Sequence, residues 1–211
     1  VSRAFISRDI RHIIPTICAA LHNEIAFPAN APPLDLIMNV HGMIDCTAHW
    51  RQEVSPDGVG QDYSLFRTDI GMPNIGALVV TSLEGVPWHV TFFSGHNNDQ
   101  GVYNITGMDR ELQQRGLFIL SDSGFNGTRM VRPDDDWRQD SGDPFFAAKH
   151  RALRATIERM FWFVESWSVA GQTCRLPLLT HVYCLDAIWK LATMLLKRNP
   201  MIAIPDAEVM E

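Results

Sequence analysis

The sequence predicts an α/β domain in which helices flank a central mixed sheet. Two observations predict this class. Short β-rich segments lie in the middle of the chain, and longer segments with helical periodicity lie at both ends. The length of 211 residues is enough for one sizeable domain with a substantial core.

The first half of the chain is expected to hold a helix, a strand and a hairpin. Apolar residues recur at near-helical spacing over residues 2–26, and a proline-rich break follows at 27–35. The short apolar run 41–50 is a strand candidate, and residues 54–62 are a turn-rich loop. Two β-rich runs joined by a Leu-Glu-Gly turn at 75–93 are typical of a hairpin.

The next segments are expected to complete the sheet. A loop at 94–101 leads into an amphipathic segment at roughly 100–115. The stretch GLFILSD (116–122) is expected to be a buried strand, and TRMVRP (128–133) a short last strand.

The last third of the chain is expected to be an acidic loop followed by two helices. The loop at 134–143 has five aspartates and is expected to be solvated. Helical patterns then run from Pro144 to about Ala170 and over 176–198, and residues 201–211 are expected to be a loose tail.

Composition narrows the class of protein. The formal net charge of −6 argues against a general nucleic-acid binder. The basic residues are 15 Arg and only 3 Lys, so the positive charge that is present favours bidentate contacts. No apolar run is long enough to cross a bilayer, and the four widely spaced cysteines indicate reduced thiols inside a cell. The first residue is not Met, so we expect a fragment or a trimmed chain.

Three acidic residues lie among apolar neighbours, where a carboxylate is costly unless it is paired or metal-bound. Asp45 lies within the first predicted strand, Asp122 ends the GLFILSD strand, and Glu158 lies on the helix after Pro144. If the two strands are adjacent and the helix crosses the sheet edge, all three can converge. Three hard oxygen donors suit Mg²⁺ or Mn²⁺, and two such ions can support phosphoryl transfer.

Two of these features also have simpler explanations. Asp122 can open a turn, as aspartate often does after a strand. His150, Arg154 and Glu158 share one helix face at i, i+4 and i+8, and the arginine and glutamate can form an ordinary surface pair. Otherwise, Arg154 can lie beside a metal-binding carboxylate and contact a phosphate.

Several short motifs, in order, resemble the DDE-superfamily transposases and endonucleases of the Harbinger type (DDE Tnp4-like). The motifs are IDCT (44–47), SGHNND (94–99), LSDSGF (120–125) and a helical stretch at 145–167, so the resemblance covers about residues 40–167. It implies an RNase H-like fold, a mixed sheet flanked by helices. It also implies a metal-dependent DDE endonuclease or transposase that cleaves or joins DNA phosphodiesters by two-metal phosphoryl transfer.

The resemblance assigns roles to individual residues. Asp45, Asp122 and Glu158 match the catalytic triad that holds two divalent ions, Mg²⁺ or Mn²⁺. Arg154 matches the family's arginine and is expected to contact substrate phosphate. Asp99 matches a further family aspartate; we expect it to cap the helix that follows, or to support the site from behind.

The resemblance also implies an organisation and partners. Residues 1–35 resemble the end of a helix-turn-helix-like module with its linker, residues 36–200 are the DDE catalytic domain, and 201–211 are the tail. DNA is the expected partner, together with a separate DNA-binding module or protein, and a homo-oligomer is left open. No membrane partner is expected, and the location is intracellular, and nuclear in a eukaryote.

The sequence departs from the family pattern in three places. The family often has an aromatic-Gly or Phe-Gly pair after the Glu-Arg, where this chain has Trp162. It often has a Lys seven residues after the Glu, where this chain has Glu165, which would repel phosphate. The basic stretch after the first strand keeps only Arg67.

Trp88, Trp162 and Trp167 are expected in the core rather than as base-stacking platforms.

Two other functions therefore stay open. One is a domesticated or decayed transposase relative that binds DNA or protein without catalysis. The other is an unrelated α/β hydrolase, which a wide separation of the three acids would favour.

Overall fold

The computed structural model describes residues 3–35, 39–52, 65–67, 71–132 and 146–200. The predicted loops at 54–62 and 134–143 and the predicted tail at 201–211 lie outside the described residues.

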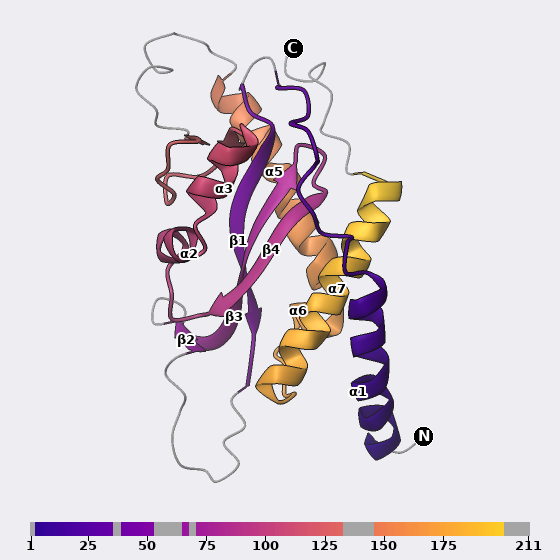
Figure 1. Cartoon of the computed structure of the whole chain (residues 1–211). Helices are drawn as coiled ribbons and strands as arrows, with labels where there is room; N and C mark the ends of the chain where they lie inside the picture. The colour runs from indigo at the N-terminus through magenta and orange to yellow at the C-terminus, as the bar shows by residue number, and fades with distance from the viewer. Residues whose placement is uncertain (1–2, 36–38, 53–64, 68–70, 133–145, 201–211) are drawn as a thin grey trace.

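A mixed sheet forms the centre of the domain (Figure 1). In chain order its strands are β1 (Gly42–Trp50), β2 (Phe66–Arg67), β3 (Met72–Ser82), β4 (Pro87–Ser94), β5 (Ile119–Leu120) and β6 (Met130–Val131). Strand β3 runs antiparallel to β1, β2 and β4, whereas β5 runs parallel to β1 and to β6. The order across the sheet is β2-β3-β1-β5-β6, and β4 also pairs with β3.

Helices cover both faces of this sheet (Figure 1). They are α1 (Arg3–Ala20), α2 (Asp99–Ile105), α3 (Met108–Arg115), α5 (Phe146–Glu165), α6 (Ser168–Gly171) and α7 (Leu178–Arg198). Helix α5 contacts β1, α7 contacts both α5 and β4, and α1 packs against α7.

The two faces arise because side chains alternate along the central strands. Met43 and Val79 belong to the core beneath α5 and α7, while their neighbours Ile44 and Val80 belong to the core beneath α2 and α3. Apolar residues at successive positions can therefore all be buried, and β3 is buried along most of its length. Asp45 falls on the α5 side of β1, the side that carries the candidate site.

The fold is the RNase H-like α/β fold that the sequence predicted. The first strand, the hairpin and the two C-terminal helices are confirmed. The first helix ends earlier than predicted, at Ala20. The amphipathic segment 100–115 is two helices rather than one, because Gly107 adopts a left-handed conformation with φ 67° between them. Of GLFILSD, only Ile119–Leu120 pair as a strand.

We expect Gly42→Ala to destabilise the fold by about 1–3 kcal/mol. Gly42 begins β1, and a methyl group there would overlap the carbonyl oxygen of Thr81 and lie 2.9 Å from the ring of Trp88. Strand β1 would have to move away from β3. Urea unfolding measures the change. Gly116→Ala is not a suitable control, because the positive φ of Gly116 disfavours alanine. The comparison is therefore Ala48→Gly, which changes the same strand without adding a group that could clash. A Gly42→Ala protein as stable as the wild type would contradict the expectation.

Candidate active site

The pairing of two parallel strands brings Asp45 and Asp122 to the same part of the sheet. Gly42 pairs with Ile119 and Met43 with Leu120, which is an offset of 77 residues. Asp45 and Asp122 each follow the last of these pairs by two residues, and both contact Arg154. The condition on which the sequence analysis made their convergence depend, that the two strands are adjacent, is therefore met.

Helix α5 crosses beside these strand ends and is held there by polar contacts on both sides of the site. Near its start, the buried His150 donates a hydrogen bond from Nε2 to the carbonyl of Ser121, at 3.2 Å. At its end, Glu165 accepts a hydrogen bond of 2.7 Å from the hydroxyl of Thr47. The helix face between these anchors is therefore fixed against β1 and the end of β5.

Arg154 lies on that face and contacts all three predicted acids. Its Nη2 atom is 3.0 Å from Oδ2 of Asp45, and its Nη1 atom is 3.4 Å from Oδ2 of Asp122. Nη2 is also 3.8 Å from Oε1 of Glu158, one helical turn further along α5. The structure thus brings Asp45, Asp122 and Glu158 around one guanidinium group, and the wide separation that would have favoured a hydrolase is absent.

The two aspartates use their oxygens in the same way. In Asp45, Oδ1 accepts from the backbone N–H of Cys46 at 2.8 Å, which leaves Oδ2 for Arg154. In Asp122, Oδ1 accepts from the N–H of Gly124 at 2.9 Å, and Oδ2 again faces Arg154. The turn expected at Asp122 is therefore present, but it occupies only one of the two oxygens. One oxygen of each residue is anchored and the other points into the site.

Asp99 does not cap α2, so that part of the prediction is wrong. The cap is Asn98, whose side chain accepts from the N–H of Gly101 at 2.6 Å. Asn98 has the extended backbone that a cap requires, and Asp99 is already the first helical residue. The Asp99 carboxylate instead lies close enough to Cys46 to help raise the pKa of its thiol, and the Oδ1 atom of Asp99 is buried without a hydrogen-bond partner.

The site carries more negative charge than its arginine can neutralise. Burial raises the pKa of Asp45 to about 6, Arg154 and the Cys46 amide lower it, and the charges of Asp122 and Asp99 raise it again. The pKa of the Cys46 thiol is raised, first by burial and then by Asp99. Three carboxyl groups therefore contact one guanidinium, and the charge of Asp99 acts on one of them, Asp45, a balance that favours an additional cation.

The residue types fit a divalent metal, although they are not arranged as a metal centre. Carboxylate oxygens are the ligands that Mg²⁺ and Mn²⁺ prefer. The Oδ2 atoms of Asp45 and Asp122 and the unpartnered Oδ1 of Asp99 are of this kind. Within the described part of the chain, however, no group of three or more His, Cys, Asp or Glu side chains is placed to hold an ion. Arg154 lies where such an ion would contact Asp45 and Asp122.

One expectation about a neighbouring residue needs correction. Trp162 is not a core residue: it is 73% exposed, one helical turn after Glu158. Trp88 is buried and Trp167 packs against the core, as predicted. Glu165, at the position where the family often has a Lys, accepts the hydrogen bond from Thr47. The side chain of Arg67 lies outside the described residues.

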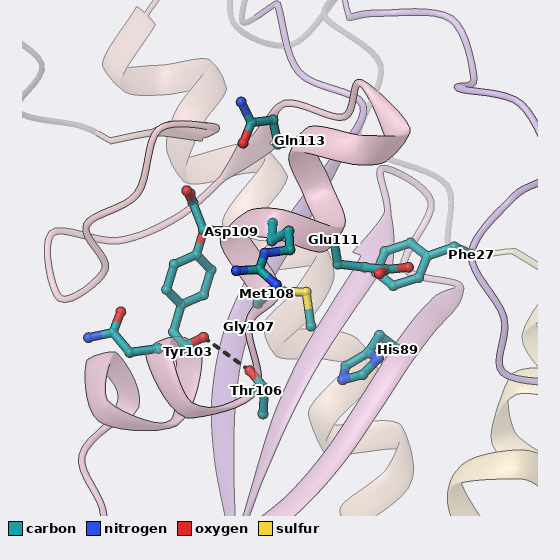
Figure 2. A pocket seen from close by; sticks show the side chains of 11 residues that line it. Phe27, His89, Tyr103, Thr106, Gly107, Met108, Asp109, Glu111 and Gln113 are labelled. Carbon is teal, nitrogen blue, oxygen red and sulfur yellow. Dashed lines mark hydrogen bonds between the residues drawn. The ribbon is translucent and has the colours of Figure 1, made fainter.

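A separate cavity of about 820 Å³ lies on the other side of the sheet, between β4 and the turn that joins α2 to α3 (Figure 2). Several of its polar groups already serve the fold. Asp109 accepts from the Tyr103 hydroxyl at 2.8 Å, and the Thr106 hydroxyl donates to backbone carbonyls. Phe27 stacks on His89, with ring centroids 5.8 Å apart. The cavity shares no lining residue with the acidic site.

Comparisons with known proteins identify one family. A family model described as DDE superfamily endonuclease matches residues 44–197, a span that contains all of α5 and nearly all of β1 and α7. Neither the curated proteins nor the solved structures gave a match. Among the described helices, none is long and apolar enough to cross a membrane.

Proposed function

The chain belongs to the DDE superfamily endonuclease family, and on this basis we propose that it is a metal-dependent endonuclease or transposase domain that cleaves or joins DNA phosphodiesters. The observation that carries the proposal is the convergence of Asp45, Asp122 and Glu158 around Arg154. These residues come from a strand, a strand end and a helix far apart in sequence, so the fold itself assembles them.

In this proposal Asp45, Asp122 and Glu158 hold two divalent ions, Mg²⁺ or Mn²⁺. Such ions activate the attacking oxygen and stabilise the leaving oxygen of a phosphodiester. The residues present suit this task, since the Oδ1 atoms of both aspartates are anchored to backbone N–H groups. That anchoring fixes the direction of each Oδ2. Glu158, whose side chain is 54% exposed, can adjust to an ion or a substrate.

Arg154 and Trp162 support DNA as the substrate. A guanidinium beside the acids can donate two parallel hydrogen bonds to a phosphate. The exposed indole of Trp162 follows Glu158 by one turn, so it lies near the place where a bound strand would pass. An exposed aromatic ring next to a nucleic-acid site can stack on a base.

The wider organisation is part of the same proposal. Residues 1–35 would be the end of a helix-turn-helix-like module and its linker, and 36–200 the catalytic domain. Helix α1, from the first segment, packs against α7 of the second. A separate DNA-binding module or protein, a homo-oligomer and a nuclear location in a eukaryote remain proposals of this kind.

Mn²⁺ calorimetry on wild type and Asp122→Ala tests the metal site. We expect wild-type binding that Asp122→Ala weakens at least about tenfold, because the variant removes an oxygen ligand. Asp186→Ala is the matched control, since it removes an acid that pairs with Lys190 on α7. Each titration is run with and without a short DNA duplex. If neither condition gives binding that depends on Asp122, the metal-dependent function is contradicted.

One observation favours the alternative of a domesticated relative without catalysis. Arg154 occupies the position between the acids, and a permanent arginine there would exclude the ions. In that case the domain would bind DNA in a salt-dependent way but would not cleave it in Mg²⁺ or Mn²⁺. Parallel binding and cleavage assays on the same duplex separate the two functions.

A further inference from the structure

We infer that Arg154 is an internal counter-cation that competes with divalent metal ions for the acidic site, so that DNA binding and metal binding strengthen each other. The inference rests on the proposed function and adds a form of regulation to it. DNA phosphate would draw the guanidinium away from the acids, which frees their oxygens for metal. Without DNA, Arg154 would hold the acids together and keep their affinity for metal low.

The first step is that Arg154 and a metal need the same atoms. The guanidinium reaches Oδ2 of Asp45 at 3.0 Å and Oδ2 of Asp122 at 3.4 Å. The Oδ1 atoms of both residues are already bonded to backbone N–H groups. The Oδ2 atoms are therefore the oxygens left for a ligand, and the guanidinium holds both of them. Arginine and metal cannot occupy this position together.

The second step concerns charge. Asp45 is largely buried, with 14% of its side chain exposed, and carboxylates that crowd together disfavour each other's ionised form. Asp45, Asp122 and Glu158 all lie within 4 Å of the same guanidinium, so three carboxylates share one positive charge. A cation at this position therefore offsets the repulsion between them. Among the described residues, Arg154 is the cation in contact with these acids. A divalent ion in its place would neutralise more of their negative charge.

The third step is that Arg154 can leave without moving its helix. Its side chain is 27% exposed, and Glu158 beside it is 54% exposed, so this edge of the cluster reaches solvent. The positions of His150 and Glu165 are fixed independently by their bonds to Ser121 and Thr47. A rotation of the arginine side chain is thus enough to carry the guanidinium from carboxylate to phosphate, which accepts the same bidentate pattern.

The coupling must be reciprocal, because it is a free energy shared by two binding events. If DNA increases metal affinity by some factor, metal increases DNA affinity by the same factor. Typical couplings correspond to about 5–150-fold. The partly exposed ion pairs here place the expectation at about tenfold, towards the lower end of that range.

Mn²⁺ calorimetry, with and without a short DNA duplex, tests the inference on wild type, Arg154→Gln and Arg151→Gln. Arg151 is an exposed arginine on the same helix and controls for the loss of one positive charge. We expect Arg154→Gln to bind Mn²⁺ about tenfold more tightly than wild type without DNA. We also expect DNA to tighten Mn²⁺ binding by wild type and Arg151→Gln, but not by Arg154→Gln.

Thermal unfolding in a chelator gives a second readout that does not depend on activity. Arg154→Gln should unfold at a lower temperature than wild type in the chelator and recover more stability on addition of Mn²⁺. Arg154→Lys serves if the glutamine variant fails to fold. A lysine ammonium group cannot contact both aspartates in the way that the guanidinium does. We therefore expect the Mn²⁺ affinity of Arg154→Lys to lie between those of wild type and Arg154→Gln.

The outcomes separate this inference from the proposed function. Mn²⁺ binding that requires Asp122, yet is equal or weaker in Arg154→Gln without DNA, would overturn the counter-cation role and leave the metal site standing. An absence of Asp122-dependent binding in every variant and condition would overturn both.

Discussion

Asp45→Asn is expected to lower metal-dependent DNA cleavage at least about a thousandfold while the domain stays folded. On the proposed function, Asp45 gives a metal ion the charged oxygen Oδ2, and asparagine has a neutral NH2 group in its place. A catalytic metal contributes several kcal/mol to transition-state stabilisation, and each 1.36 kcal/mol is about a factor of ten in rate. The measurement is cleavage of a labelled DNA duplex in Mg²⁺ and in Mn²⁺.

The fold should tolerate this substitution because asparagine has the shape of aspartate and removes a costly charge. Burial raises the pKa of Asp45 to about 6, so the ionised form is disfavoured where it sits. The loss of the Arg154 contact offsets this gain. We expect the unfolding midpoint to change by no more than about 4 °C, equivalent to roughly 1 kcal/mol.

Asp186→Asn, an acid on α7 that pairs with Lys190, should retain wild-type cleavage. An Asp45→Asn protein that is folded and keeps more than about a tenth of wild-type activity would remove Asp45 from the proposed triad.

The sequence predicted the fold well where a segment's periodicity matched its burial. The run 41–50 and the hairpin at 75–93 are β-rich and became the paired core strands β1, β3 and β4. The segment 100–115 was harder, because its break depends on the positive φ of Gly107 rather than on periodicity. GLFILSD gave only a two-residue strand, since β5 leaves the sheet after Leu120 to form the turn at Asp122.

The order of the site residues and their spacing along the chain could be predicted from the sequence. The offset of 77 residues between Asp45 and Asp122 equals the offset of the paired residues in β1 and β5, but that pairing is visible only in the structure. The sequence places Arg154 on the same helix face as Glu158. Its contacts with Asp45 and Asp122 are visible only in the structure. Asp99 was off by one residue as a cap, because Asn98 and Asp99 both suit that position. The exposure of Trp162 was missed because an aromatic residue on an amphipathic helix usually faces the core.

A pair of buried histidines should make the fold sensitive to acid. In His49, Nδ1 donates to the carbonyl of Ala170 at 3.0 Å and Nε2 accepts from the indole N–H of Trp189 at 3.2 Å. In His181, Nε2 donates to the carbonyl of Val169 at 3.1 Å, and Nδ1 lies 3.2 Å from Nη1 of the buried Arg51. Each ring therefore uses one nitrogen as an acceptor, which requires the neutral form.

Protonation would break these acceptor bonds and place charge beside Arg51. Burial, the largest cause, lowers the pKa of both His49 and His181 to about 4, from 6.5 in an exposed histidine. The unfolded chain therefore binds more protons than the folded one between these values. The stability that the pair contributes is present above pH 6.5 and is lost as the pH falls towards 4.

Asp45 acts in the opposite direction. Its pKa of about 6 lies above the 3.8 of an exposed aspartate, so the folded chain takes up its proton first as the pH falls. That uptake stabilises the folded state over the same range and partly hides the loss from the histidines. An Asp45→Asn background removes this compensation, and the acid-induced loss of stability should be steeper in it than in wild type.

Urea unfolding at several pH values in the Asp45→Asn background isolates the contribution of the two histidines. Each shift is worth up to about 3 kcal/mol, and since the charge of one ring disfavours that of the other, the pair should lose less than about 6 kcal/mol between neutral pH and pH 4. His49→Gln should be less stable at neutral pH because it loses the Trp189 and Ala170 contacts, yet its stability should fall less steeply with acid. His12→Gln, at an exposed position on α1, should follow the unsubstituted background. If the stability of His49→Gln falls as steeply with acid as that of the background, the acid sensitivity arises elsewhere. If it falls less steeply, packing of α7 against β1 depends on the neutral form of the His49 ring, through its contact with Trp189.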